Sequence, residues 1–285
     1  MISFIGAGKV GSALGLYFKQ KGLSIGGYFS RTYERAHIVS KLTNSKVFAS
    51  MSDVLMNSSM IWITVSDDAL ESVAKEISEL EIPSHINAFI HTSGVHSQKI
   101  LKSIDDKGFA TYCAHPLMAF VDAKESARQL NEVYFSLETP TKEKLQKDEN
   151  ENDNYLINFF KRTGNKTLQI DTEKKELYHC AAAVLSNYLV TLLNLSYEMF
   201  EDTGITKATI KKATTPLLES TLKNISENDD MKDALTGPIK RGDRTTIMKH
   251  LQALEKFMPN KTTLYKELGK ETMEMLQNYR LKDIL

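Results

Sequence analysis

The first 170 residues alternate short apolar runs with segments whose apolar residues recur at helical spacing. The run at 60–65 is apolar at almost every position, which is typical of a strand buried on both faces of a sheet. Short runs that predict strands lie at 2–5, 24–29, 46–48, 60–65, 87–92, 110–114, 133–137 and 166–170. Strands that alternate with helices predict an α/β domain with a mostly parallel sheet.

This pattern changes after Asp171, where only helical spacing continues. The predicted helices lie at 173–201, 206–225, 244–257 and 264–279. A chain of 285 residues is long enough for two hydrophobic cores. We therefore predict an α/β domain over 1–171 and an all-helical domain over 172–285. We also expect a solvated loop at 139–154, and we expect Asp67 and Asp243 to cap the helices that begin after them.

The first strand runs directly into a glycine-rich turn and then into a helical pattern. The turn reads Gly6, Ala7, Gly8, Lys9, Val10 and Gly11. In this spacing the first glycine permits a tight turn, the second lets a pyrophosphate approach the backbone, and the third lets the helix pack against the strand. The helix N-terminus then attracts the phosphates. The motif predicts a Rossmann-type dinucleotide site, and a purely structural glycine turn is the alternative.

The end of the second strand indicates which dinucleotide is bound. NAD-binding proteins usually carry a carboxylate there, but this chain reads Ser30, Arg31 and Thr32. Hydroxyl and guanidinium groups suit a 2′-phosphate, so we predict NADP as the cofactor. The alternative is that Arg31 is an ordinary solvated side chain. Val65 and Ser66, at the end of the fourth strand, are expected to line the same site.

Four more segments carry a resemblance to a known group of proteins: 91–94, 114–117, 178–188 and 235–243. With the glycine turn, they resemble an uncharacterised bacterial group of Rossmann-like oxidoreductases with a C-terminal helical domain of unknown function. This group is related to pyrroline-5-carboxylate reductases, deazaflavin-dependent NADP oxidoreductases and 6-phosphogluconate or β-hydroxyacid dehydrogenases. The resemblance implies the fold and NADP, but no substrate. The dehydrogenases carry a catalytic lysine four residues before an asparagine, whereas here Ala183 precedes Asn187 at that spacing.

Polar residues at strand ends and on the first long helix are the candidates for chemistry. Ser93 and His115 lie near the carboxyl ends of the fifth and sixth strands, where ligands bind in open parallel sheets. His179 and Asn187 are eight residues apart and share one predicted helical stripe with Lys175, which we expect to line a cleft between the domains. The alternative is that these side chains are buried and satisfy hydrogen bonds of the fold.

These residues suggest roles in a hydride-transfer reaction. His179 is the first choice as proton donor, because an imidazole titrates near neutral pH. Asn187 and Ser93 are expected to orient the reacting group, with His115 nearby. Arg241, in a turn-rich segment, would bind a substrate carboxylate or is simply a surface charge.

Composition and charge exclude several classes of function. The chain has 36 basic and 36 acidic residues, which argues against a nucleic-acid partner. Two cysteines, Cys113 and Cys180, form no disulfide framework, so a cytoplasmic protein is expected. We expect the apolar segment 181–195 to be too short and too polar for a membrane span. Apolar residues of the C-terminal helices predict a homodimer; these residues are Leu217, Leu218, Leu222, Leu251, Leu254, Phe257 and Met258.

The sequence therefore predicts a cytoplasmic NADP-dependent oxidoreductase that transfers a hydride to or from a small carbonyl, hydroxyl or imine compound. The competing hypothesis is a non-catalytic dinucleotide-binding sensor or regulatory module.

Overall fold

The computed structural model describes residues 1–139 and 155–285, and its chain forms two compact units, Met1–Tyr188 and Leu189–Leu285. The loop predicted at 139–154 lies outside the described residues, apart from its first residue. The expected domain boundary after Asp171 stays a prediction.

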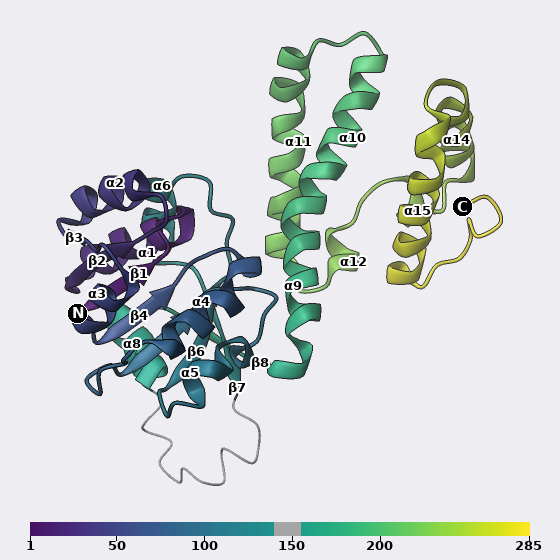
Figure 1. The fold of residues 1–285 in the computed structure, drawn as a ribbon. Helices are drawn as coiled ribbons and strands as arrows, with labels where there is room; N and C mark the ends of the chain where they lie inside the picture. The colour runs from purple at the N-terminus through teal and green to yellow at the C-terminus, as the bar shows by residue number, and fades with distance from the viewer. Residues whose placement is uncertain (140–154) are drawn as a thin grey trace. The chain divides into compact units, whose positions relative to one another are not determined.

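The first unit is built on an eight-stranded sheet with the order β3-β2-β1-β4-β5-β6-β7-β8 in the described part of the chain (Figure 1). Neighbouring strands are parallel except for β6 and β7, which are antiparallel. The strands are β1 (Ile2–Ile5), β2 (Ile25–Phe29), β3 (Lys46–Val47), β4 (Met60–Ile63), β5 (Ala88–His91), β6 (Thr111–Pro116), β7 (Phe135–Thr139) and β8 (Thr167–Asp171). The predicted mostly parallel Rossmann-type sheet is confirmed, although β6 extends further than expected and includes His115.

Helices cover both faces of this sheet, and each face has its own hydrophobic core. Trp62 of β4 packs into the core that Phe18 of α1 (Lys9–Gln20) and Phe160 of α8 (Tyr155–Thr163) share. Ile61 and Ile63 of the same strand point into the opposite core, beneath α3 (Met51–Met56) and α4 (Asp67–Glu79). Since successive side chains of a strand point to opposite faces, burial on both sides explains the uninterrupted apolar run. Within the described residues, the remaining helical segments of the sheet region are α2 (Tyr33–Thr43), η1 (Gln98–Leu101), α5 (Lys102–Asp105) and α6 (Ala123–Gln129).

The chain leaves the sheet through one long helical stretch. A short 3₁₀ turn (Thr172–Lys174) leads into α9 (Lys175–Ala183), a π-helical turn (Val184–Tyr188) and α10 (Leu189–Asp202). By length and composition alone, the stretch Thr172–Asp202 is apolar enough to cross a membrane, with a mean hydropathy of 1.3. The segment 181–195 is part of this longer stretch, and the expectation that it does not span a membrane stays a prediction. The same pattern also occurs in helices that are buried in a protein core.

The second unit is helical, as predicted. It contains α10, α11 (Lys207–Glu227), α12 (Met231–Ala234), α13 (Pro238–Arg241), α14 (Arg244–Phe257) and α15 (Thr262–Leu276). Leu251 and Leu254 are both buried here, so they belong to this unit's interior and not to the exposed apolar surface we expected.

The two predicted helix caps had different outcomes. Asp243 caps α14, because its carboxylate accepts a hydrogen bond from the Thr246 amide at 3.1 Å. Asp67 does not cap α4. It is the first helical residue, and Ser66 takes the N-cap position.

Candidate functional site

The glycine-rich turn has the geometry that its spacing predicts. Gly6 has a φ of +110°, and a side chain there would meet the Thr64 carbonyl oxygen at 2.6 Å. A Cβ on Gly11 would lie 2.3 Å from Thr64 Oγ1, so this glycine lets α1 pack closely against β4. Gly8 is different, since no atom lies within 4 Å of the position its Cβ would occupy. The backbone at Gly8 is therefore open to a ligand, whereas Gly6 and Gly11 are required by packing.

A groove of about 430 Å³ opens above this turn. It is lined by Gly6, Ala7 and Gly8, by the end of β2 and by the segment after β4, which includes Val65 and Ser66. Lys9, Val10 and Gly11 form the first turn of α1 and are not among its lining residues. Gly8 stands at the N-cap of α1 and offers no side chain, so the amides of the first turn are available to an anion.

The end of the groove at β2 carries two guanidinium groups. Ser30, Arg31 and Thr32 all line it, and Ser30 Oγ accepts a hydrogen bond from the Thr32 amide at 3.2 Å. Arg35, four residues after Arg31, lines the same end. Sequence reasoning missed Arg35, although it lies in the first turn of the predicted helix that follows Arg31.

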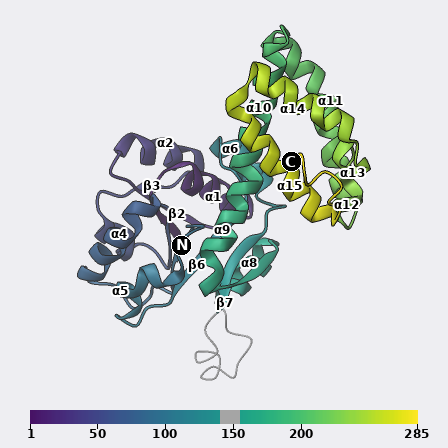
Figure 2. The ribbon, with the colours of Figure 1, turned by 90° about the vertical axis from the view of Figure 1, so that its right-hand side faces the viewer.

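Helix α9 passes the sheet at β6 and β7 (Figure 2). A second set of polar side chains makes contacts between this helix and these two strands. The rings of His115 and His179 lie 6.0 Å apart between centroids, nearly perpendicular to one another. His115 Nδ1 forms a hydrogen bond of 3.0 Å with the Tyr178 hydroxyl. The structure thus brings together one histidine from a strand and one from the long helix. Sequence reasoning did not assign Tyr178 to the site, although it directly precedes His179 on the predicted helix.

Gly94 packs directly against both rings of this histidine cluster. A Cβ built on it would lie 2.3 Å from His179 Nδ1 and 2.9 Å from His115 Nε2. Both ring nitrogens therefore face the same backbone position. His179 Nδ1 is buried and has no hydrogen-bond partner within the described residues, so its capacity to form a hydrogen bond is unused there.

The environment keeps both neighbouring histidine rings on the sheet neutral. Burial, followed by the nearby Lys175 ammonium, lowers the pKa of His115 to about 4. Burial also lowers the pKa of His91, on the adjacent strand, to about 3. At neutral pH the His115 ring is therefore uncharged and can serve as a hydrogen-bond donor or acceptor.

The remaining predicted site residues are placed elsewhere. Ser93 is buried, and its hydroxyl accepts hydrogen bonds from the amides of Val95 and His96, at 3.3 and 3.0 Å. It therefore holds the turn that carries Gly94. Asn187 is exposed, and its side chain accepts a hydrogen bond from Ser186.

Asn187 lies inside the π-helical turn Val184–Tyr188, where the regular α-helical spacing that the expected stripe assumed does not hold. Arg241 ends α13 in the second unit and is exposed. Its proposed contact with substrate stays a prediction.

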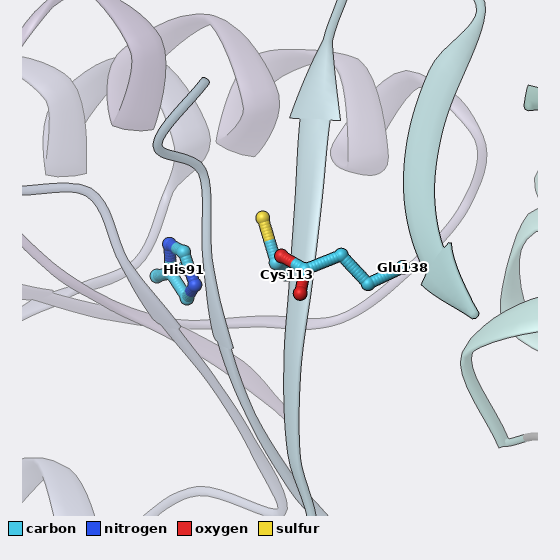
Figure 3. Close-up of side chains that lie close together, drawn as sticks. All are labelled: His91, Cys113 and Glu138. Carbon is cyan, nitrogen blue, oxygen red and sulfur yellow. The ribbon is translucent and has the colours of Figure 1, made fainter. Parts of the chain in front are cut away.

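A buried cluster adjoins the histidines. His91, Cys113 and Glu138 come from β5, β6 and β7, and their side chains converge (Figure 3). One ligand-type atom of each lies within 4.8 Å of the other two. Lys175 enters the same space, with Nζ 2.9 Å from Cys113 Sγ and 3.5 Å from Glu138 Oε1. The sequence did not indicate this cluster, because its members are far apart along the chain.

Comparison with known families agrees with the fold. Residues 1–116 match the model of a Rossmann-like domain, and residues 145–272 match a domain of unknown function, DUF2520. The order of the two matches, a Rossmann-like domain followed by DUF2520, confirms the predicted resemblance. No protein of curated function matches its sequence.

Solved structures share the fold over nearly the whole chain. Protein TM1727 from Thermotoga maritima is 24% identical, with a TM-score of 0.72 over 97% of this chain and 98% of its own. BF3122 from Bacteroides fragilis, provisionally named an NADP oxidoreductase, is 22% identical, with a TM-score of 0.73 over 96% and 97%. The imine reductase from Myxococcus stipitatus in complex with NADP+ is 15% identical, with a TM-score of 0.60 over 96% and 94%.

Proposed function

We propose that this protein is an NADP-dependent oxidoreductase that transfers a hydride to or from a small carbonyl, hydroxyl or imine compound. The observation that carries the proposal is the pairing of an open dinucleotide groove at β1, β2 and β4 with a histidine cluster at β6 of the same sheet. The similarity to an imine reductase with bound NADP+ over almost the full chain supports the same class.

The groove residues suit NADP in particular. The open backbone at Gly8 leaves room for the pyrophosphate beside the first turn of α1, and Gly6, Ala7, Val65 and Ser66 also line the groove. Ser30, Arg31, Thr32 and Arg35 would bind the 2′-phosphate, since guanidinium groups can donate two parallel hydrogen bonds to it. When bound, the nicotinamide supplies the hydride chemistry.

The protein's own part is to meet the charge that develops on the substrate. Reduction of a carbonyl or imine requires a proton or a hydrogen bond at the heteroatom. His179 is our candidate for this role, because its buried Nδ1 lies beside Gly94 and has no hydrogen-bond partner in the described residues. His115, fixed by Tyr178, would orient the same heteroatom. Ser93 would act indirectly by holding the Gly94 turn, while Asn187 and Arg241 are less direct candidates.

The test is NADPH oxidation measured against a panel of small carbonyl and cyclic imine compounds. We expect His179→Ala to lower turnover by about 10²- to 10⁴-fold with little change in NADP affinity. Cys180→Ser, at the exposed neighbouring position, is the matched control and should keep full activity. NADP binding without turnover of any compound would favour the sensor hypothesis instead.

We further propose that the protein works in the cytoplasm as a homodimer. The long helical stretch exposes large apolar side chains, among them Leu177, Leu185 and Tyr188, with exposed fractions of 69%, 72% and 62%. Leu217, Leu222 and Phe257 are also exposed. A second copy of the chain would bury this surface in a two-fold symmetric dimer, which is the most common closed assembly of identical chains. Light scattering should give twice the mass of 32.2 kDa, and no association with lipid vesicles is expected.

A further inference from the structure

Lys175 is buried to an extent that requires explanation. Its exposed fraction is 1%, and it is among the largest fully buried side chains of the described chain. A buried ammonium group is stable only if it is paired and hydrogen-bonded. The Glu138 carboxylate, whose side chain is 3% exposed, provides the opposite charge at 3.5 Å, and Cys113 Sγ accepts a hydrogen bond at 2.9 Å. Glu138 is itself held by the Gln98 amide, at 2.9 and 3.0 Å.

The cluster is therefore better explained by this internal cation than by a metal ion. His91, Cys113 and Glu138 have the spacing of a metal site, but the ammonium of Lys175 already contacts two of the three ligand atoms. His91 Nδ1 accepts a hydrogen bond from the Ser93 amide at 3.3 Å, so the proton of the neutral ring lies on Nε2. Neither nitrogen then has a lone pair available without rearrangement.

The place of Lys175 in the sequence connects this cluster to the candidate site. Tyr178 and His179 lie three and four residues after it, on the same side of α9. Lys175 also lies 6.0 Å from the centre of the Tyr178 ring. An anchor between α9 and the strands β6 and β7 thus determines where Tyr178 and His179 meet His115.

We propose that Lys175 is a positioning residue for His115. Its ammonium group fastens α9 to the sheet through Cys113 and Glu138, and its positive charge adds to burial in disfavouring a protonated His115 ring, whose Nδ1 is bonded to Tyr178. The use of His115 in catalysis rests on the proposed function, whereas the charge state of the ring does not.

Several other charged or titratable groups surround His115. Lys175 and His179 on α9 lower the pKa of His115, and Asp67 at the start of α4 raises it. The other titratable groups near this ring are Tyr178 on α9, His91 on β5, and the Glu138 and Cys113 partners of Lys175. Among these charged groups, Lys175 has the largest effect on the pKa of His115, so it is the group to substitute.

The experiment is an NMR titration of the histidine rings in the full-length protein, with the His115 signal assigned from its loss in His115→Gln. In the wild type we expect a midpoint near pH 4. In Lys175→Met the midpoint should rise by about one unit or more, because a positive charge is lost and Glu138 is left uncompensated. Cys113→Ala is the matched control, since it removes the sulfur contact but leaves the charge, and its midpoint should equal that of the wild type.

If Lys175→Met does not fold, the Lys175→Met/Glu138→Gln variant gives the decisive measurement. Replacing both partners of a buried ion pair is often close to neutral for stability, and its midpoint should still exceed that of the wild type. An unchanged midpoint in both variants would overturn the proposal. So would a Cys113→Ala shift as large as that of Lys175→Met, or a sulfur–cobalt absorption band on adding Co²⁺, which would show a metal displacing Lys175.

Discussion

Two glycine-to-alanine substitutions, at Gly8 and Gly94, test the cofactor groove and the histidine cluster independently of one another. Neither Gly8 nor Gly94 has a positive φ, so alanine can adopt both backbone conformations. At Gly94 the new Cβ would lie 2.3 Å from His179 Nδ1 and 2.9 Å from His115 Nε2, well inside van der Waals contact. The rings would have to move by roughly 1 Å, and overpacking of this kind costs about 1–3 kcal/mol. At Gly8 nothing lies within 4 Å of the Cβ, so the folded chain has room for it.

The expected results are opposite for the two variants. Gly94→Ala should lower the melting temperature by about 2–4 °C for each kcal/mol lost, shift the ring signals of both histidines and reduce turnover. Its affinity for NADP should stay at the wild-type value. Gly8→Ala should keep the wild-type melting temperature and ring signals but bind NADP at least about tenfold more weakly, because the methyl group occupies the place of the pyrophosphate.

Scanning calorimetry, NMR and titration calorimetry with NADP measure these three properties. Unchanged histidine signals in Gly94→Ala would refute the arrangement of the cluster. Unchanged NADP affinity in Gly8→Ala would refute the assignment of the groove. The two conclusions are independent, since neither residue contributes to the other site.

Three further predictions concern cofactor choice, acid stability and assembly. Arg31→Ala and Arg35→Ala should each reduce the preference for NADP over NAD by about tenfold in titration calorimetry, and equal wild-type affinities would contradict this. Because the folded pKa of His115 is about 4, the unfolded chain binds more protons than the folded chain between pH 6.5 and 4. As the pH drops through that range, the free energy of unfolding from urea titrations should therefore fall by up to about 3 kcal/mol more in the wild type than in His115→Gln, because His91, whose pKa is lowered to about 3, adds its own loss to both proteins. Leu185→Asp should halve the mass in light scattering, whereas a wild-type monomer would exclude the dimer.

Features that depend on neighbours along the chain could be predicted from sequence. The run at 60–65 indicated a strand covered on both faces, and Ile61 and Trp62 do face separate cores. The glycine spacing indicated the turn, the open backbone at Gly8 and the close packing at Gly11. Asp243 was correctly expected to cap α14. Each of these rests on local geometry, namely strand alternation, backbone torsion or a cap hydrogen bond.

Features that depend on register or on distant contacts could not be predicted. The interpretation of a stripe from Lys175 to Asn187 assumed a regular α-helix, and a single π-helical turn was enough to break it. The pairing of Lys175 with Glu138 joins α9 to a strand 37 residues earlier, and no spacing rule indicates it. Arg35 is an intermediate case, since its place in the first turn of the helix after Arg31 pointed to the groove only once the end of β2 was known.

The burial of Lys175 also bears on how the reaction would proceed. Related dehydrogenases place a lysine one helical turn before an asparagine, where this chain has Ala183. Lys175, two turns earlier, cannot replace that lysine, because its ammonium is 1% exposed and bound by Cys113 and Glu138. A group so enclosed cannot reach a substrate, and its release would leave the Glu138 carboxylate buried without a partner. In the proposed reaction, proton transfer would therefore fall to the imidazoles beside Gly94, and the lysine would influence the reaction through the charge state and position of His115.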